Sequence, residues 1–519
     1  MKRGAQAAEG PPNLPLITFG AMLATVMQAL DTTIANVALP QMQGTFSVSY
    51  DQVTWVLTSY IVAAAIMTPP TGWLSNRFGR KRLYLVSVTG FTIASVFCGM
   101  ASSVTVMVLF RILQGMFGAA LVPLSQATLL DSYPRERHGP AMAIWGVGIM
   151  VGPILGPTLG GYLTDNYSWR WVFYINVPVG ILAFMVISSS VRETARNLTL
   201  RFDTFGFAMI SLAIAALQMF LDRGELKDWF GSPEIITEAV MAGLFLYIFL
   251  VHTFTAANPF ISPSLFLDRN FSVSLVLIAA VGVVLYATMA LLPPLMQDLL
   301  NYPVVTAGLL LAPRGVGTMI AMLIVGRIIV RIDVRILLIF GFALSAYSLY
   351  WMDGFSLAEP TWEFVASGVT QGFGLGFVFV PLTTVAFSTL APDRRNEAAG
   401  IYNLFRNIGS SAVISAMTAL LLQNTQLSHE DIGAHITAFN PLLHLPGIER
   451  VWNPYTAKGL ALLNNEVTRQ ASMIAYLDDF KFLMILTALL TPLVLLLRPP
   501  KTSRSQGQVQ GQPAHAILD

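Results

Sequence analysis

Charged residues are scarce in this chain. Only 11% of its 519 residues are Asp, Glu, Lys or Arg, whereas 55% are hydrophobic, and soluble globular proteins carry about 25% charged residues. A basic excess is also missing, since 30 Lys and Arg face 28 Asp and Glu and leave a net charge of +2. The first deficit excludes a soluble fold. The second excludes nucleic acid as the partner, because binding a phosphate backbone requires many uncompensated cations.

Cysteine is nearly absent, and histidine is not clustered. The single cysteine, Cys98, lies within an apolar run, and the six histidines lack the spacing of metal ligands. An internal disulfide, a cysteine-based metal site and zinc chemistry are therefore excluded. Gly372, Gly374 and Gly376 alternate within an apolar run that no strand precedes, so they are not a dinucleotide-binding fingerprint. We expect neither a metal nor a cofactor.

Long apolar runs are what the chain has in abundance. A helix needs about 20 mostly apolar residues to cross a hydrocarbon core of about 30 Å, and fourteen such runs are separated by charged or turn-rich breaks. The sequence therefore predicts an all-α membrane protein with fourteen transmembrane helices. The predicted spans are residues 14–39, 53–73, 83–101, 104–124, 141–162, 173–190, 205–221, 235–254, 271–292, 305–326, 336–352, 363–382, 398–423 and 480–497.

The distribution of Lys and Arg predicts the orientation of these spans. Cytoplasmic loops of membrane proteins are enriched in both residues. With the N-terminus inside, twenty of the thirty lie on inner segments and only three lie in short outer loops. An even number of spans returns the chain to the side from which it starts. We therefore expect both termini to be cytoplasmic.

Three segments lie outside the predicted spans. Residues 1–13 form a short cytoplasmic segment, and residues 498–519, rich in Gln, Gly and Ser, are typical of a disordered cytoplasmic tail. Residues 424–479 are expected to form a long outer loop, helical in part because residues 457–476 are amphipathic. This loop either docks on a partner outside the membrane or is solvated without one, and the sequence leaves both alternatives open.

Two opposite charges lie well inside predicted spans. Asp31, the only carboxylate clearly within a span, is about 12 Å from the outer end of its helix, and Arg111 is about 10 Å inside the fourth helix, at 1.5 Å per residue. Ionisable groups at such depth mark functional sites. The matched depths predict a pair, which serves proton coupling or is a structural salt bridge. Gln114 and Gly118 share the face of Arg111, and Gln28 shares the small and polar face of Asp31, which suits a water-filled cavity.

The connection after the second predicted span is rich in glycine and cations. Gly72 and Gly79 allow a tight turn, and Asn76, Arg77 and Arg80 lie between or beside them. The cations can meet helix C-termini or acidic groups and so latch one conformation. The alternative is that they only anchor the topology. We treat this connection as a candidate gating loop.

The fifth predicted span carries glycines at a strict four-residue spacing. Small residues on one helix face let a neighbouring helix approach closely, and prolines inside a helix remove backbone hydrogen bonds and bend it. We therefore predict that this face serves both helix packing and gating. Its residues are Gly148, Gly152, Pro153, Gly156, Pro157 and Gly160.

The second half of the chain offers two intramembrane cations, Arg314 and Arg406, with no carboxylate deep in the same region. Backbone carbonyls or water can satisfy them, or they can attract an anionic group of a substrate. We assign a candidate substrate cavity to Gln28, Thr32, Asn36, Gln114, Gly118, Arg314 and Arg406.

These segments resemble motifs of the major facilitator superfamily. Residues 72–82 resemble its G-x-L-a-D-r-x-G-r-r/k loop, with Asn76 where the family usually has Asp. Residues 109–115 resemble the l-x-R-x-x-q-G motif, associated there with proton transfer, and residues 148–161 resemble the antiporter motif of its exporters. Residues 30–40 and 169–180 look like signatures of fourteen-span drug:proton antiporters in that superfamily, the inner-membrane pumps of tripartite export systems.

The resemblance carries expectations for fold and function. It implies two six-helix bundles, here residues 14–190 and 271–497, with two extra helices inserted within residues 191–270. It also implies export of hydrophobic toxic compounds across a bacterial inner membrane in exchange for protons. A membrane-fusion adaptor and an outer-membrane channel would be the partners.

The expected mechanism is alternating access of the two bundles around a cavity near the midplane. A proton from outside would neutralise Asp31, loosen its hold on Arg111 and favour the inward-open state. One alternative is a superfamily importer, or an exporter of a specific metabolite or lipid-like compound. A less favoured alternative is an intramembrane enzyme, for which we expect a cluster of His, Asp or Ser that this chain lacks.

Overall fold

A computed structural model describes residues 13–194, 196–197, 201–224, 227–391, 394–436, 443, 452–453 and 455–498. All regular structure in these residues is helical. The first part contains α1 (Leu14–Phe46), α2 (Tyr50–Met67), α3 (Thr71–Phe78), α4 (Arg80–Met100), α5 (Val104–Gly118), α6 (Leu121–Ser132), α7 (His138–Asn166), α8 (Trp171–Tyr174) and α9 (Asn176–Ser190). Then follow α10 (Thr204–Arg223), α11 (Pro233–Thr255), α12 (Arg269–Pro294), α13 (Val304–Ile328), α14 (Val334–Asp353), α15 (Thr361–Ser388), α16 (Arg395–His435) and α17 (Ala457–Leu490).

The number of spans agrees with the expectation from hydropathy. Thirteen helical stretches of the described chain are long and apolar enough to cross a membrane, and α2 with α3, bent by 55°, makes a fourteenth. The bend falls where Pro69 and Pro70 follow α2, because proline cannot donate the backbone hydrogen bond that continues a helix. The break between α3 and α4 is Gly79, whose φ of +94° is a conformation that glycine adopts without strain.

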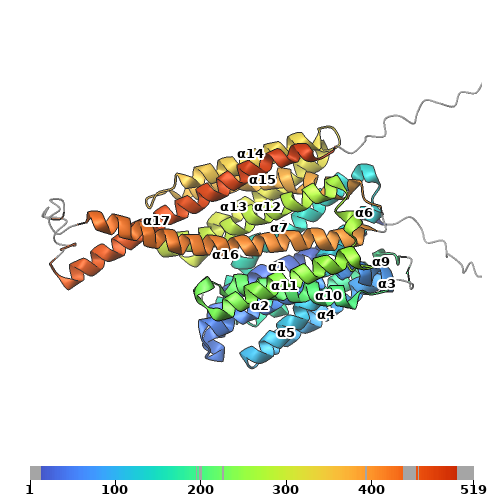
Figure 1. Ribbon diagram of the computed structural model, residues 1–519, viewed down its shortest axis with the longest axis horizontal. Helices are drawn as coiled ribbons and strands as arrows, with labels where there is room; N and C mark the ends of the chain where they lie inside the picture. Colours follow the sequence, from blue (N-terminus) through green and yellow to red (C-terminus); the bar gives the residue numbers. More distant parts are fainter. Residues whose placement is uncertain are drawn as a thin grey trace, which may run out of the picture.

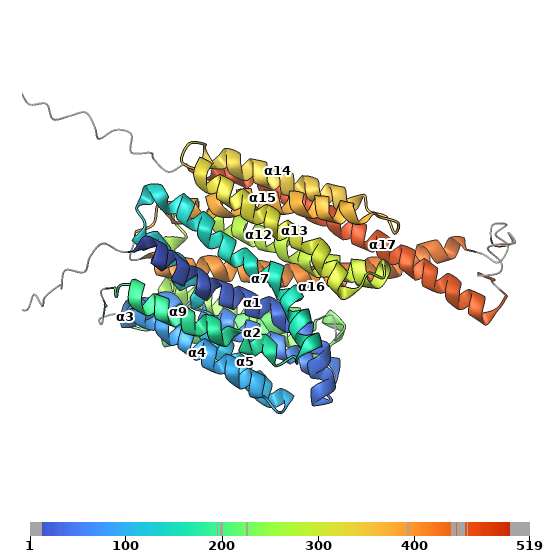
Figure 2. The ribbon, with the colours of Figure 1, turned by 180° about the vertical axis from the view of Figure 1, so that it is seen from behind.

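The helices form two bundles with an inserted pair beside them (Figure 1). Helices α1 to α9 build one bundle and α12 to α17 the other, and Figure 2 shows the same division from behind. The inserted helices α10 and α11 pack on each other, and α10 also contacts α2 of the first bundle and α16 of the second. The Ser415 hydroxyl of α16 donates to the Leu221 carbonyl of α10 at 2.7 Å. The inserted pair thus touches both bundles.

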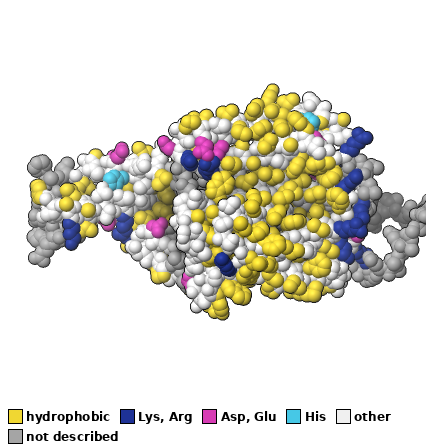
Figure 3. Space-filling view, turned by 90° about the horizontal axis from the view of Figure 1, so that it is seen from below, with side chains coloured by type: hydrophobic (Ala, Val, Ile, Leu, Met, Phe, Trp, Pro, Cys, Tyr) yellow, Lys and Arg dark blue, Asp and Glu magenta, His cyan; other side chains and the backbone are white. Residues whose placement is uncertain are grey.

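The molecular surface fits a membrane. Figure 3 shows apolar side chains covering the body of the molecule and Lys and Arg gathered at one end of that face. Large apolar side chains are exposed on helices throughout, among them Met100, Leu109, Tyr247 and Phe254. An apolar belt of this extent is unstable in water and is what lipid covers in membrane proteins.

The structure differs most from the sequence expectation in residues 424–479. Helix α16 continues to His435 and α17 begins at Ala457, so most of the expected loop consists of two long helices. They project beyond the bundles as an arm (Figure 1), and we call residues 424–436 and 455–468 the arm. Hydropathy marks only the apolar part of such a helix, because the part beyond the membrane is amphipathic. The expected N-terminal segment, apart from residue 13, and the expected tail beyond residue 498 lie outside the described residues.

The longer α17 also corrects the statement that Asp31 is the only carboxylate inside a span. Asp479 lies within this helix and is 1% exposed. Neither of its carboxylate oxygens has a hydrogen-bond partner among the described residues. Hydropathy predicts a span that begins at residue 480, so Asp479 lies one residue outside the predicted span.

Candidate functional site

A buried ion pair forms the centre of the first bundle. Asp31 of α1 and Arg111 of α5 are both fully buried, and Nη1 of Arg111 lies 2.7 Å from Oδ2 of Asp31. A buried pair is tolerated only with good geometry and with further hydrogen bonds to the remaining polar atoms. The structure therefore brings together the two charges that matched depth had predicted to pair.

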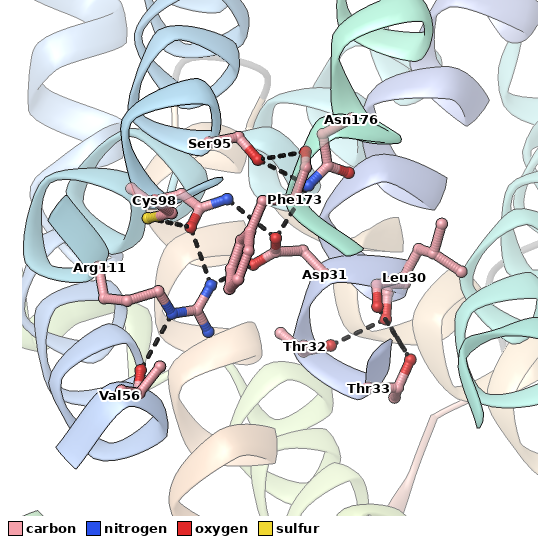
Figure 4. A network of polar contacts seen from close by, with 12 residues as sticks. Leu30, Asp31, Thr32, Thr33, Val56, Ser95, Cys98, Arg111, Phe173 and Asn176 are labelled. Carbon is pink, nitrogen blue, oxygen red and sulfur yellow. Dashed lines mark hydrogen bonds and ion pairs between the residues drawn. The ribbon is translucent and has the colours of Figure 1, made fainter. Parts of the chain in front are cut away.

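Further donors complete the environment of the carboxylate (Figure 4). Gln114 Nε2 and Asn176 Nδ2 donate to Asp31 Oδ1 at 2.8 and 2.9 Å. Arg111 in turn donates through Nε to the Val56 carbonyl at 3.0 Å and through Nη1 to Gln114 Oε1 at 2.8 Å. Asp31 thus accepts three hydrogen bonds, which suits an ionised carboxylate because that form only accepts. A proton added to it would remove the negative charge that these three donors stabilise.

Aromatic rings and small polar groups surround this network. The Arg111 guanidinium lies 4.2 Å from the centroid of the Tyr60 ring and 5.6 Å from that of Phe173, where the ring face attracts a cation. Asn176 Nδ2 also reaches Ser95 Oγ at 3.0 Å, and Ser95 donates to the Phe173 carbonyl at 2.8 Å. The network therefore links α1, α2, α4, α5, α8 and α9. A change of charge at Asp31 alters hydrogen bonds that connect these six helices.

Sequence reasoning missed the neutral members of this network. Asn176 lies in the segment that carries the family resemblance, but Asn176, Ser95 and Tyr60 were not chosen as site residues. A neutral polar side chain in an apolar run gives no signal comparable to that of a charge, because its burial requires only one or two hydrogen bonds. Position within the resembling segment was the one available signal, and it applied to Asn176 alone.

The side of α1 that carries Asp31 is packed against other helices in this structure. Ala24, Ala35 and Ala38, which share the side of Asp31, are fully buried against other helices. Their small size allows close packing of helices. Thr32 and Asn36 lie on the exposed part of α1 instead. The ion pair joins this side of α1 to Arg111 of α5, and α9 packs directly on α1.

Three more residues of the predicted cavity are placed differently from one another. Gln28 is half-buried, and its Oε1 has no hydrogen-bond partner among the described residues. Gln114 belongs to the ion-pair network and is fully buried, so it does not line a cavity here. Gly118 is a packing position, since a Cβ there would lie 3.0 Å from the Phe91 ring and 3.1 Å from the Tyr60 hydroxyl.

The predicted gating loop forms α3 and the turn into α4. Gly72 is buried, Asn76 and Arg77 are half-buried, and Gly79 supplies the positive φ of the turn. The Asn76 carbonyl accepts a hydrogen bond from the backbone N–H of Asn197 at 2.9 Å. This contact ties the loop to the segment that follows α9.

The carboxylate that this loop lacks at Asn76 comes from elsewhere in the bundle. Asp131, at the end of α6, lies 2.7 Å from Nη2 of Arg80 and 3.0 Å from Nη1 of Arg395. Arg395 begins α16, so one carboxylate joins cations of both bundles. Asn403 of α16 donates to Gln126 of α6 at 3.2 Å, and both are buried. The two bundles are thus joined by polar contacts at the end where α1 begins.

The glycine face of α7 packs on α1. A Cβ at Gly152 would clash with the backbone carbonyl group of Ala29, and one at Gly156 would clash with a side chain of α1. At Gly160 the nearest atom would be 2.9 Å away, whereas at Gly148 it would be 3.6 Å away, which is ordinary contact. Close approach therefore needs glycine at three of the four positions, and Gly148 has room. Pro153 and Pro157 lie within α7, and their side chains lie outside the described part.

We expect Gly152→Ala to lower transport and the stability of the folded protein, with Gly148→Ala as the matched control. The new methyl at residue 152 meets backbone, which cannot rotate away, and overpacking of this kind typically costs about 1–3 kcal/mol. At residue 148 the new methyl makes only an ordinary contact with the Met22 side chain and should be neutral or slightly stabilising, because alanine favours a helix over glycine by about 1 kcal/mol. Thermal unfolding in detergent and flux in proteoliposomes check both variants. Equal behaviour of the two would show that the α1 contact does not restrict this face.

The second bundle contains the two predicted cations. Arg314 of α13 is buried and Arg406 of α16 is half-buried. Neither has an ion-pair partner in the described part of the chain. In the same residues no group of three or more His, Cys, Asp or Glu side chains is placed to hold a metal ion.

Comparisons with known proteins agree on one family. The sequence pattern that defines the Major Facilitator Superfamily matches residues 21–414. The multidrug export protein EmrB of Escherichia coli K12 is 38% identical over 432 residues, 82% of this chain and 84% of that protein. The probable multidrug resistance protein EmrY of the same organism is 36% identical over 499 residues, 95% of this chain and 96% of that protein.

Two further similarities extend this comparison. The fatty acid resistance protein FarB of Neisseria gonorrhoeae is 35% identical over 497 residues, 95% of this chain and 98% of that protein. The crystal structure of the human organic anion transporter MFSD10 superimposes with a TM-score of 0.58 and 14% identity, covering 92% of this chain and all of that chain. At this identity the structural likeness shows the fold alone.

Proposed function

The chain belongs to the major facilitator superfamily, and from that premise we propose that it exports hydrophobic toxic compounds across a bacterial inner membrane in exchange for protons. It is a multi-pass membrane transporter and not an enzyme. Its relatives EmrB and EmrY are named multidrug export and multidrug resistance proteins. The observation that carries the proposal is the buried Asp31–Arg111 pair, a titratable group tied to six helices of one bundle.

The proposed cycle uses this pair as the proton-sensitive element. With both termini in the cytoplasm, the contacts of Asp131 with Arg80 and Arg395 join the two bundles at the cytoplasmic end. A proton bound at Asp31 removes the charge that holds Arg111 and so weakens the ion pair. The helices are then free to repack, and the bundles rock toward the inward-open state, where the substrate enters and the proton leaves.

Purified protein in proteoliposomes tests the proposal. An imposed pH gradient should drive a fluorescent hydrophobic dye across the membrane, and a protonophore should stop it. Equilibration of dye at the same rate with and without the gradient would indicate a facilitator and contradict proton exchange. Dye movement together with the proton flow, and not against it, would indicate an importer.

We further propose that the arm, defined above, serves an outer partner of the adaptor type. The arm lies beyond the bundles, and its helices pair through His429 Nε2 and Asn464 Oδ1 at 3.2 Å. It exposes the apolar side chains Leu427, Leu460 and Leu462, with Leu427 57% exposed. Burial of these side chains against a partner would stabilise a complex, because it removes apolar surface from water. An outer-membrane channel would complete such an assembly.

Removal of residues 427–466, with a short Gly-Ser turn in their place, should abolish cellular drug resistance and leave proton-driven transport into inverted vesicles. The cut spares Arg469, whose Nε donates to the Leu299 carbonyl and fastens α17 to the body. The variant Leu427→Ser with Leu460→Ser keeps the arm and tests its apolar surface alone. Loss of both activities in the deletion, or of neither, would contradict a role in partner docking.

A second candidate function is export of a specific lipid-like compound. The similarity to FarB, a protein named for fatty acid resistance, favours it. A susceptibility panel in a pump-deficient host, containing both drugs and fatty acids, separates the two candidates.

A further inference from the structure

The second bundle contains a buried cation without a counter-charge. Arg314 on α13 is 6% exposed. Its guanidinium makes one hydrogen bond, from Nη2 to the Leu285 carbonyl of α12 at 3.1 Å. Its Nε has no partner among the described residues. Arg111 in the first bundle, by contrast, has a carboxylate, an amide oxygen and a carbonyl as acceptors.

Among the described residues, the surroundings of Arg314 contain an unused hydrogen-bond donor and no acidic group. The Thr288 hydroxyl lies 3.2 Å from both the Leu285 carbonyl and Gln371 Oε1. Gln371 on α15 is fully buried, and its Nε2 has no partner among the described residues. These contacts connect α12, α13 and α15. Two donors of the cluster, Arg314 Nε and Gln371 Nε2, have no acceptor atom among the described residues.

A second cation lies along the same side of α12. A Cβ built on Gly282 would lie 3.5 Å from Cγ of Arg406 on α16, and residues 282 and 285 are one turn apart on the same helix face. Arg406 is half-buried, and its Nε is also without a partner in the described structure. The start of the Arg406 side chain thus lies against the turn of α12 whose Leu285 carbonyl accepts a hydrogen bond from Arg314.

This cluster lies beside the contact between the two bundles. Gly315, next to Arg314 in the chain, packs so closely on Ile154 of α7 that a Cβ there would clash with it. Alternating access separates the bundles at such contacts. The cluster is therefore one residue from a surface that opens during transport.

An uncompensated buried cation costs several kcal/mol. An arrangement of this kind becomes favourable when an anion binds, because guanidinium and carboxylate form paired, charge-assisted hydrogen bonds. We propose that Arg314, with Gln371 and Arg406, forms a subsite for the carboxylate head of an amphiphilic substrate. This inference rests on the proposed export function. It assigns binding of the negatively charged substrate group to the second bundle and binding of the proton to the first.

Direct binding tests the subsite without a proton gradient. The probes are radiolabelled dodecanoate and its methyl ester, which share the chain and differ in charge, with protein in nanodiscs and empty nanodiscs as the blank. We expect tighter binding of dodecanoate than of the ester. Arg314→Gln should weaken dodecanoate binding by about 10- to 100-fold, the range of one or two charge-assisted hydrogen bonds, and leave ester binding unchanged.

Three further variants serve as controls and as an alternative to Arg314→Gln. Arg314→Lys retains the charge and should keep part of the preference, and Arg406→Gln, at a half-exposed position, serves if Arg314→Gln does not fold. Arg327→Gln on the same helix, where the guanidinium only reaches the exposed Leu323 carbonyl, is the matched control and should not change binding. Equal binding of dodecanoate and ester by the unchanged protein would overturn the proposal and assign Arg314 to carbonyl and water contacts only.

The two proposals fail in different ways. If export is right and the subsite wrong, a neutral dye still moves under a pH gradient and dodecanoate shows no preference over its ester. If the subsite is right and proton exchange wrong, dodecanoate binding still depends on Arg314, while no dye movement responds to the gradient.

Discussion

Asp31→Asn is expected to abolish pH-driven transport, with a loss of at least tenfold in flux at equal amounts of folded protein. Asparagine keeps the size of the side chain, and its Oδ1 can still accept from Gln114 and Asn176. It cannot gain or lose a proton, so the charge at this position no longer changes during the cycle. The measurement is substrate flux into proteoliposomes against an imposed pH gradient, with substrate binding measured separately at constant pH.

Asp31→Glu is the matched control for this variant. It keeps a titratable carboxylate but lengthens the side chain by one methylene in a fully buried site, so slower transport that still responds to pH is expected. Full pH-driven transport by Asp31→Asn would remove Asp31 from the coupling role. Loss of substrate binding as well as flux would show that the network holds the binding conformation and does not only carry the proton.

The sequence predicted the charged centre of the site because charge leaves few alternatives in a membrane. An aspartate and an arginine at matched depth must each find a partner, and the pair was predicted although α1 runs seven residues beyond the predicted end of its span. The cross-bundle carboxylate was not predicted. Asp131 is at the end of a span, where an acidic residue is unremarkable, and its meeting with Arg395 of the other bundle depends on tertiary packing.

Periodicity predicted the helices better than their roles. The four glycines of α7 look equivalent in the sequence, yet a Cβ would be too close to α1 at only three of them, whereas at Gly148 it would make an ordinary contact with the Met22 side chain. The arm shows the same limit, since hydropathy detects membrane crossing and not the continuation of α16 and α17 beyond it. Residue spacing predicts which face of a helix packs closely on a neighbour. Tertiary packing determines at which residues of that face the close contact occurs.

Removal of the Arg111 cation alone should destabilise the folded protein. In Arg111→Met the Asp31 carboxylate remains fully buried with Gln114 and Asn176 as its remaining donors, and breaking a buried ion pair from one side costs about 3–5 kcal/mol. Asp31→Asn leaves Arg111 with the Val56 carbonyl, Gln114 and the Tyr60 ring face. We therefore expect Arg111→Met to give little folded protein and a clearly lowered unfolding temperature.

The double variant Asp31→Asn with Arg111→Met separates folding from coupling. It buries no net charge, and replacement of a buried ion pair by neutral groups is often close to neutral for stability, so folded protein should recover to near the level of the unchanged chain. Transport should remain insensitive to the pH gradient, because no titratable group stands at residue 31. A double-mutant cycle of unfolding free energies in detergent measures the pair. If the losses of stability of the two single variants simply add in the double variant, the two side chains do not act as a pair. If the double variant regains pH-driven transport, another carboxylate carries the coupled proton. The buried Asp479 of α17 is the first position to examine in that case.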